Sequence, residues 1–256
     1  MCLIVLGMGL RADVPMMLAA NRDEFFARPT QAAHFWPDAD HVLAGRDLEQ
    51  GGTWLGLTRS GRLAAVTNYR EGGRPRTGKR SRGWLVRDFL ASGEEPAGYL
   101  GRVQGASREY DGFNLLLGTG DGLHYYSNRA GDPMPLSPGV HGLSNHLLDS
   151  PWPKVERAKA RMAALADAPW DALEARLFEL LADDRRAPDE ELPQTGVSLE
   201  WERVLSSAFI RTEAYGTRSS TVIVIGVDGQ MLFEERSFAA DGAEAQRRRF
   251  ELRAGS

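Results

Sequence analysis

The sequence predicts an α+β fold in which helices cover mostly antiparallel sheets. Three pairs of strand-like runs are each joined by a short turn that contains glycine, and amphipathic helical segments lie between these pairs. Short turns join antiparallel neighbours, because parallel strands need a much longer crossover connection. Strands followed by helices and then by further strands are typical of the α+β class.

The predicted strands begin at the N-terminus with the runs 2–9 and 15–20, which we expect to pair with each other. Three hairpins follow, and a glycine, for which positive φ is free, lies in each turn. Their strands are 53–58 with 62–67, 113–118 with 123–127, and 221–227 with 231–236. These runs together give about eight strands.

The predicted helices are segments with apolar residues every three or four positions. They are 84–91, 153–165, 170–182 and 199–209. The segments 70–82 and 183–198 contain several glycines and prolines and are predicted loops. We expect the polar tail 239–256, which includes the arginine run 247–249, to be partly frayed.

Composition indicates one globular domain over residues 1–256, because the chain can bury a sizeable core and contains no convincing linker. The formal charge of −4 argues against a general nucleic-acid binder. The single cysteine excludes an internal disulfide and fits a reducing compartment, so we expect a cytoplasmic protein. The apolar run 2–10 is too short to span a membrane, which needs about 20 residues. The oligomeric state is left open.

Cys2, the only cysteine, is the first candidate for chemistry. A small residue at position 2 generally permits removal of the initiator methionine, after which Cys2 would carry a thiol and a free α-amine. Their reference pKa values, about 8.5 and about 7.7–8.0, both lie near working pH. One residue could then supply both nucleophile and general base. The alternative interpretation is an inert, apolar cysteine at the edge of a core strand.

The polar run 21–24 directly follows the second predicted strand. Such a run is costly to bury without partners. In a functional interpretation, Asp23 contacts the α-ammonium of Cys2, and Arg22 lies beside the thiolate or the substrate, where a cation lowers the pKa of a thiol. The alternative is a solvated turn with an internal salt bridge.

Three further polar residues lie near the ends of predicted strands. Asn68 and Asn145 each offer an amide donor of the kind that an oxyanion hole requires, although asparagine is also a common turn residue. Arg218, just before the last hairpin, could bind an anion or brace the site.

These features together resemble the NRDE family, also called the transport and Golgi organisation protein 2 family. The resemblance is carried by Cys2 and by the runs 21–24 (NRDE), 51–56 (GGTWLG), 67–70 (TNYR), 143–145 (LSN) and 217–220 (TRSS). NRDE alone is a short motif, but the ordered series is specific and extends over nearly the whole chain.

The resemblance implies a four-layer αββα sandwich of the N-terminal nucleophile hydrolase kind, similar to choloylglycine hydrolases and penicillin V acylases. In those hydrolases an N-terminal cysteine attacks an amide, an aspartate holds the α-amine, an asparagine helps to bind the oxyanion and arginines support the nucleophile. By position, these catalytic roles are implied for Cys2, Asp23, Asn145, Arg22 and Arg218. We expect the substrate to contact Asn21, Trp54, Asn68, Tyr69, Arg70 and Ser144.

One position departs from the hydrolase pattern. There the first arginine lies three residues before the aspartate, whereas this chain has Ala20 at that place and Arg22 adjacent to Asp23. Neighbouring residues of a strand point to opposite faces. This departure argues against a contact between Arg22 and the thiol, so the resemblance implies the fold more strongly than the activity.

The function that we expect is an amidohydrolase-like protein that acts on an acyl amide or thioester through the Cys2 thiolate. The alternative is a non-catalytic binding or trafficking protein that uses the same cleft for haem, acyl-CoA or lipid. The partner is then a small acyl substrate or an amphipathic ligand, with no nucleic acid and no integral membrane contact.

No cofactor is expected to be required, and haem enters only under the alternative. His141 and His146 are the best candidates for a haem ligand, although a lone histidine in a loop is more often plain surface. The loop 70–82 could recruit an anion through its cations, or be a solvated loop. These cations are Arg70, Arg74, Arg76, Lys79, Arg80 and Arg82.

Overall fold

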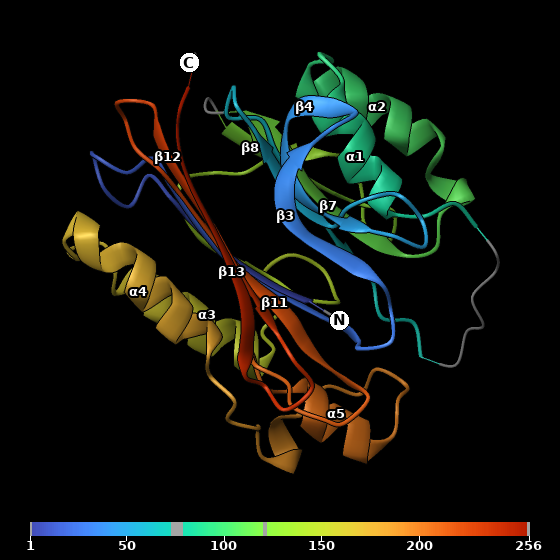
Figure 1. Ribbon diagram of the computed structural model, residues 1–256. Coiled ribbons are helices and arrows are strands. Elements are labelled where there is room, and N and C mark those ends of the chain that lie inside the picture. The colour runs from blue at the N-terminus through green and yellow to red at the C-terminus, as the bar shows by residue number, and fades with distance from the viewer. Residues whose placement is uncertain (1, 73–78, 120–121, 255–256) are drawn as a thin grey trace.

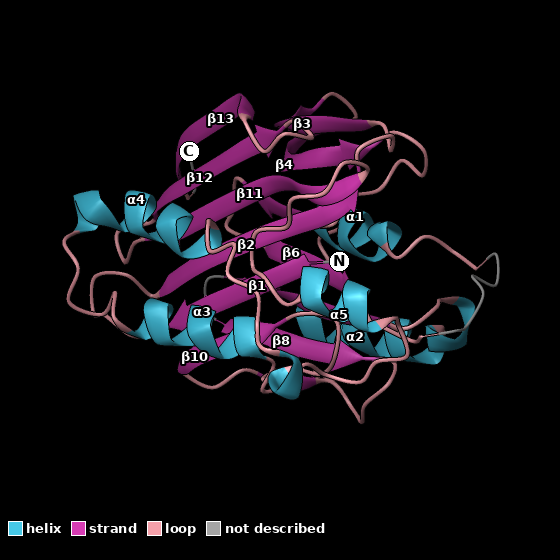
Figure 2. Ribbon diagram, turned by 90° about the horizontal axis from the view of Figure 1, so that it is seen from below, coloured by secondary structure: helices cyan, strands magenta, loops and turns pink. Residues whose placement is uncertain are grey.

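The computed structural model describes residues 2–72, 79–119 and 122–254. Its strands form two sheets that stack on each other, and helices cover the outer face of each sheet (Figures 1 and 2). All the strand pairs of the described residues are antiparallel. The molecule is therefore an αββα sandwich, as the sequence predicts.

The first sheet carries the N-terminal strand second from one edge. Its order is β10-β1-β2-β11-β12-β13. The strands are β10 (Gly139–Leu143), β1 (Cys2–Met8), β2 (Met16–Phe25), β11 (Tyr215–Ile225), β12 (Gln230–Phe238) and β13 (Glu244–Arg253). Strand β1 is apolar on both faces, since Leu3 and Ile4 are each fully buried. A strand with this pattern needs cover on both sides.

The second sheet follows the chain order almost strand by strand. Its order is β3-β4-β5-β6-β7-β8-β9. The strands are β3 (Thr30–Trp36), β4 (Ala39–Asp47), β5 (Leu55–Thr58), β6 (Leu63–Asn68), β7 (Phe113–Thr119), β8 (Gly122–Ser127) and β9 (Met134–Pro135).

Three apolar clusters hold the layers together. Between the sheets, Ile4 and Leu18 pack with Leu57 and Leu116. Outside the first sheet lie α3 (Pro153–Ala163) and α4 (Trp170–Leu181), and outside the second lie α1 (Gly83–Ala91) and α2 (Pro96–Gly105). The short helix α5 (Leu199–Leu205) lies at the end of the molecule at which β11 begins, and its Leu205 packs with Tyr215 (Figure 1).

The three predicted hairpins and the four predicted helices are present, with bounds shifted by a few residues. Strand β2 extends to Phe25, so the run 21–24 lies inside a strand and not after it. Similarly, β11 begins at Tyr215 and includes the run 217–220. The short strands β9 and β10, the hairpin β3–β4 and helix α2 were not predicted.

The C-terminal segment differs from the expectation of a frayed tail. Its residues Glu244–Arg253 form β13, which pairs with β12. Phe250 packs edge-to-face on Phe35 and Phe233, with ring centroids 5.8 Å and 6.3 Å away. The arginine run obscured this alternation of apolar residues in the sequence. Charged residues are a common protection of an edge strand against pairing with other chains.

No helix in the described ranges is long and apolar enough to cross a membrane.

Candidate active site

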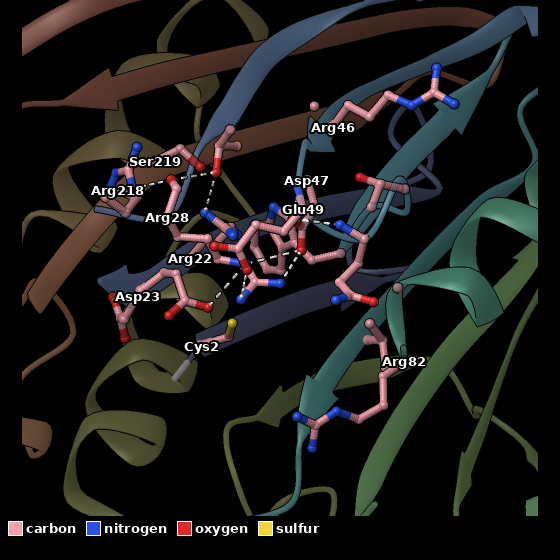
Figure 3. A pocket seen from close by; sticks show the side chains of 18 of the residues that line it. Cys2, Arg22, Asp23, Arg28, Arg46, Asp47, Glu49, Arg82, Arg218 and Ser219 are labelled. Carbon is pink, nitrogen blue, oxygen red and sulfur yellow. Dashed lines mark hydrogen bonds and ion pairs between the residues drawn. The ribbon is translucent and has the colours of Figure 1, made fainter. Parts of the chain in front are cut away.

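A cavity of about 660 Å³ lies between the two sheets, beside the apolar core that joins them (Figure 3). Its walls come from β1, β2, β11, β12 and β13 of the first sheet and from β3, β4 and β6 of the second. Several segments that lie far apart in the sequence therefore meet here. We call this space the intersheet cavity.

One cross-strand row of the first sheet forms a polar floor for the intersheet cavity. The register pairs Cys2 with Arg22, Arg22 with Ser219, Ser219 with Ser237, and Ser237 with Gln246. All five line the cavity. Directly paired residues of antiparallel strands present their side chains on the same face. With strands about 4.8 Å apart, the row spans roughly 19 Å from the thiol to β13.

The alternation of β2 divides the run 21–24 between the two faces of the sheet. Arg22 lies opposite Cys2 on the cavity face. The side chains of Asn21 and Asp23 point the other way, toward the helix layer, where Asp23 meets Thr217. The departure from the hydrolase pattern therefore leaves Arg22 beside the thiol, and it is the Asp23 carboxylate that lies behind the sheet.

Cys2 lines the cavity and is partly exposed. Burial raises the pKa of its thiol, and the negative charge of Asp23 acts in the same direction. The positive charge of Arg22 and the main-chain N–H of Asp23 oppose this increase. Because burial dominates, the resting residue is a thiol, and its ionisation needs a base.

The backbone of residue 2 is held by the segment that follows β10. The main-chain nitrogen of Cys2 donates to Oδ1 of Asn145 at 3.3 Å, and Oγ of Ser144 donates to the Cys2 carbonyl at 2.8 Å. Nδ2 of Asn145 donates to the Asn68 carbonyl at 2.9 Å. Asn145 thus presents its oxygen to residue 2, while its donor is used by Asn68.

Asp23 lies in a buried charged cluster behind Cys2. Oγ1 of Thr217 donates to its Oδ1 at 2.7 Å. Burial raises the pKa of Asp23, and the positive charge of Lys154 opposes this. Lys154 is 1 % exposed, its Nζ has no hydrogen-bond partner among the described residues, and burial lowers its pKa to about 8. The two buried charges stabilise each other electrostatically.

Three arginines surround the thiol end of the cavity (Figure 3). Arg28 pairs with Asp47 at 2.6 Å and Glu49 at 2.9 Å. Arg22 has one long contact, from Nη1 to Oγ1 of Thr30 at 3.4 Å. Nη1 of Arg218 donates to main-chain carbonyls at the end of β2 and in the segment that follows it.

Other predicted substrate contacts lie outside the cavity. Asn21 is fully buried and bonds the carbonyls of Leu181 and Ala208, which fixes the helix layer to β2. Ser144 holds the Cys2 backbone from behind. Arg70 forms a buried ion pair with Glu202 at 2.9 Å.

Tyr69 also lies away from the cavity lining, and its ring lies 5.0 Å from that of His146. Of the predicted substrate contacts, Trp54 and Asn68 do line the cavity. The register of the strands, which the sequence does not reveal, decides which of these polar residues face inward.

The loop 70–82 contributes Lys79, Arg80 and Arg82 to the cavity wall. Arg80 pairs with Glu109 at 2.8 Å. Arg74 and Arg76 lie outside the described residues, so the predicted anion site in this loop remains a prediction.

The described residues contain no cluster of three or more histidine, cysteine, aspartate or glutamate side chains that could hold a metal ion. His141 bonds Asp149 and the Ser137 carbonyl, both at 2.9 Å. His146 bonds Oγ of Ser150 at 2.7 Å.

Three residues of this region were missed from the sequence. Lys154 lies in a predicted helix, where a lysine is normally on the solvent-exposed face. Arg28 follows the NRDE run but belongs to no motif. Glu235 lies in a predicted strand whose neighbouring strands cannot be identified from the sequence. Glu235 lines the cavity and accepts a hydrogen bond from the main-chain nitrogen of Ala33 at 2.8 Å. Burial raises its pKa. Only the tertiary structure brings these residues to the site.

Comparison with known proteins gives both a sequence likeness and a fold likeness. Residues 1–240 match the family described as Transport and Golgi organisation 2. The chain is 41% identical over 242 residues to the transport and Golgi organization protein 2 homolog of Bos taurus and 38% identical to that of Homo sapiens. Each match covers 87% of this chain and 86% of the relative.

Among solved structures, the fold is similar to that of the Caenorhabditis elegans N-acylethanolamine-hydrolyzing acid amidase ortholog. The TM-score is 0.51 at 13% identity, with 87% of this chain and 92% of the other covered. At this identity the likeness concerns the fold alone, which is that of N-terminal nucleophile hydrolases.

Proposed function

Because this chain belongs to the Transport and Golgi organisation 2 family and has an N-terminal nucleophile hydrolase fold, we propose that it cleaves an acyl amide or thioester through Cys2. The observation that carries this proposal is the position of residue 2. Its thiol faces a cavity of substrate size beside Arg22, and its main-chain nitrogen is held by Asn145 at 3.3 Å. These two contacts support a role for residue 2 as both nucleophile and base.

In the proposed mechanism, removal of Met1 converts the Cys2 nitrogen into an α-amine, which takes the proton from the thiol. The thiolate attacks the substrate carbonyl, so that a C–S bond forms and the carbonyl oxygen becomes an oxyanion. Collapse breaks the C–N or C–S bond of the substrate, and the α-ammonium returns the proton to the leaving group. Water then hydrolyses the acyl-thioester and regenerates the thiol.

The contacts support distinct roles for the surrounding residues. Asn145 holds the amine through its Oδ1, so the oxyanion falls to Asn68, which lines the cavity. Asp23 stabilises the ammonium from behind the sheet. Lys154 satisfies part of the charge of Asp23, which keeps the pKa of the α-amine low enough for it to act as a base.

A second candidate is a non-catalytic carrier of haem, acyl-CoA or lipid in the same cavity. The observation that favours it is the raised pKa of Cys2, because a buried thiol without a base is inert. The polar floor of the cavity argues against a ligand with a large apolar body, since such ligands usually bind among apolar side chains.

A hydrolysis screen with a Cys2→Ala control separates the two candidates. Acyl p-nitroanilides and acyl thioesters of graded length are incubated with each protein, and the N-terminus is defined by intact mass. The proposal expects turnover in the wild type and loss of at least 100-fold in Cys2→Ala. Equal rates in the two proteins would overturn the catalytic role, and saturable ligand binding without turnover would support the carrier.

A further inference from the structure

Two guanidinium groups at the cavity lack a carboxylate partner. Among the described residues, the ion pairs of the intersheet cavity use Arg28, Arg46 and Arg80 and leave out Arg22 and Arg218. Arg22 is only 8 % exposed, yet within the described ranges its side chain makes one hydrogen bond, the long contact with Thr30. Buried charges are normally paired, so this arginine is expected to meet an anion that the chain does not supply.

Arg218 is directed to this place by an irregularity in β11. The register between β2 and β11 shifts between Thr217 and Ser219, so Arg218 has no partner residue across the strand pair. Bulges of this kind redirect a side chain. Its Nη1 donates to the carbonyls of Phe25, Phe26 and Arg28 at 2.9–3.1 Å, which fixes the guanidinium and leaves Nε and Nη2 available.

Arg22 and Arg218 line the same cavity and lie close enough to repel each other electrostatically. Burial, and then the positive charge of Arg22, lowers the pKa of Arg218, with the charge of Glu24 opposing. Ser219 lies between them as the strand neighbour of Arg218 and the cross-strand partner of Arg22. Glu235 also lines the cavity and interacts electrostatically with Arg22, but burial raises the pKa of its carboxyl and so favours the neutral form.

We propose that Arg22, Arg218 and the Ser219 hydroxyl form an anion subsite that binds a carboxylate or phosphate of the acyl substrate. Planar guanidiniums suit both groups, because they donate paired hydrogen bonds to two oxygens. Arg22 is the direct cross-strand partner of Cys2, so the anion lies one to two strand spacings, about 5–10 Å, from the thiol. The substrate class is therefore a short acyl compound with an anionic group close to the scissile carbonyl.

Binding of simple anions tests the subsite without catalysis. Calorimetry at low ionic strength compares succinate, inorganic phosphate and neutral succinamide. The subsite predicts binding of one or both anions, but not of succinamide, and the stronger anion identifies the substrate group. Arg218→Gln weakens binding at least tenfold and Arg218→Lys restores part of it. Arg102→Gln, at an exposed arginine that pairs with Glu94, is the matched control.

A second variant keeps both arginines. Ser219→Asp places a carboxylate between them and is expected to abolish anion binding. Ser219→Asn introduces a side chain of similar size without the charge, and its anion affinity is expected to remain at least tenfold higher than that of Ser219→Asp. The subsite would be overturned if Ser219→Asp and Arg218→Gln bound succinate and phosphate as tightly as the wild type does. It would also be overturned if the wild type bound succinamide as tightly as the anions.

The substrate class rests on the proposed function, and a turnover experiment separates the two. Succinyl p-nitroanilide and neutral butyryl p-nitroanilide are compared by kcat/KM. The subsite predicts at least a tenfold preference for the succinyl compound and a ratio near 1 in Arg218→Gln. Anion binding without any Cys2-dependent turnover would refute the proposed function alone. Turnover that favours the butyryl compound would refute the anionic substrate class alone.

Discussion

At the scale of single residues, position 2 is held from two sides. Asn145 binds its nitrogen and Ser144 binds its carbonyl, so the first residue of β1 has a fixed orientation at the cavity. A fixed orientation matters because an amine can act as a base for its own thiol only when both groups are positioned. The proposed chemistry therefore depends on these two backbone contacts as well as on the thiol.

The charged pair behind Cys2 gives the first prediction. Asp23→Asn removes the negative charge that stabilises the buried ammonium of Lys154 and weakens the hydrogen bond from Thr217. The free energy of unfolding of this variant therefore falls by about 1–3 kcal/mol. A charge at an exposed strand end would add little to stability, but Asp23 is buried inside β2, so its replacement affects folding. Lys154→Met is destabilising for the converse reason. The double variant loses less than the sum of the two, because neither charge is left alone.

Urea unfolding of the four proteins measures this coupling, and turnover measures the catalytic part. The double variant recovers stability but not Cys2-dependent turnover. Asp189→Asn, at an exposed pair with Arg203, is the control and leaves the unfolding midpoint nearly unchanged. Strictly additive effects of the two buried substitutions would show that Asp23 and Lys154 are independent.

Alkylation of Cys2 gives the second prediction. Because burial raises the pKa of the thiol, iodoacetamide labels Cys2 at pH 7 more slowly than it labels a cysteine peptide, and the difference narrows as pH rises. This reverses the rapid labelling that exposure alone suggests. Arg22→Gln slows labelling further and Asp23→Asn accelerates it, since their charges act oppositely on the thiol. Labelling rates of both variants equal to that of the wild type would contradict this electrostatic account.

At the scale of elements, Asp183 fastens the end of α4 to its surroundings. Its carboxylate accepts from Nε and Nη2 of Arg185 at 2.8 and 2.9 Å and from Nε of Arg157 on α3 at 3.3 Å. Its carbonyl accepts from the main-chain nitrogens of Ala208 and Phe209, in the segment that leads to β11. Asp183 therefore joins the helix layer to the first sheet.

The pH dependence of this junction is the third prediction. The hydrogen bonds from Arg185 lower the pKa of Asp183 to about 2, below its unfolded value of about 3.9. A depressed carboxyl pKa stabilises the fold above the unfolded pKa, and the contribution is lost as pH falls through the folded pKa. Asp183→Asn therefore lowers the free energy of unfolding at pH 6, and its penalty shrinks at pH 3. Urea titrations at both pH values measure it; a penalty that grows on acidification would contradict it.

Local patterns explain which elements could be predicted. The hairpin β5–β6 and helices α3 and α4 carry their signals in neighbouring residues, as glycine turns or apolar spacing. Strand β13 pairs within a sheet whose other strands are distant in sequence, and its apolar residues Phe250 and Leu252 are embedded among charges. Its arginine run favoured a solvated tail in the sequence because packing against Phe233 is a tertiary effect.

In the candidate site, too, some residues carry a local sequence signal and others depend on tertiary packing. Cys2, Arg22 and Arg218 could be identified from motifs, because family resemblance preserves residue types in order. The opposite placement of Asn21 and Asp23 behind the sheet depends on strand extension to Phe25, and the role of Lys154 depends on how α3 packs. Neither is encoded in local spacing, so both required the structure.

At the scale of the whole molecule, the sandwich places reactive residues at the junction of its two sheets. The first sheet supplies the thiol and the polar floor, and the second supplies the facing wall with Asn68 and Trp54. The close relatives define the family, whereas the likeness to the acid amidase at 13% identity defines only the architecture. Function must therefore be tested at residue 2 itself.

The most direct test is intact-mass spectrometry of the protein quenched during reaction with succinyl thioester or p-nitroanilide, followed by peptide mapping. The account predicts an N-terminal Cys2 without Met1, and a transient addition of the succinyl mass on Cys2 that decays as product accumulates and is absent from Cys2→Ala. A chain that retains Met1 and gains no acyl group on Cys2, while it is folded and binds the substrate, would contradict the account.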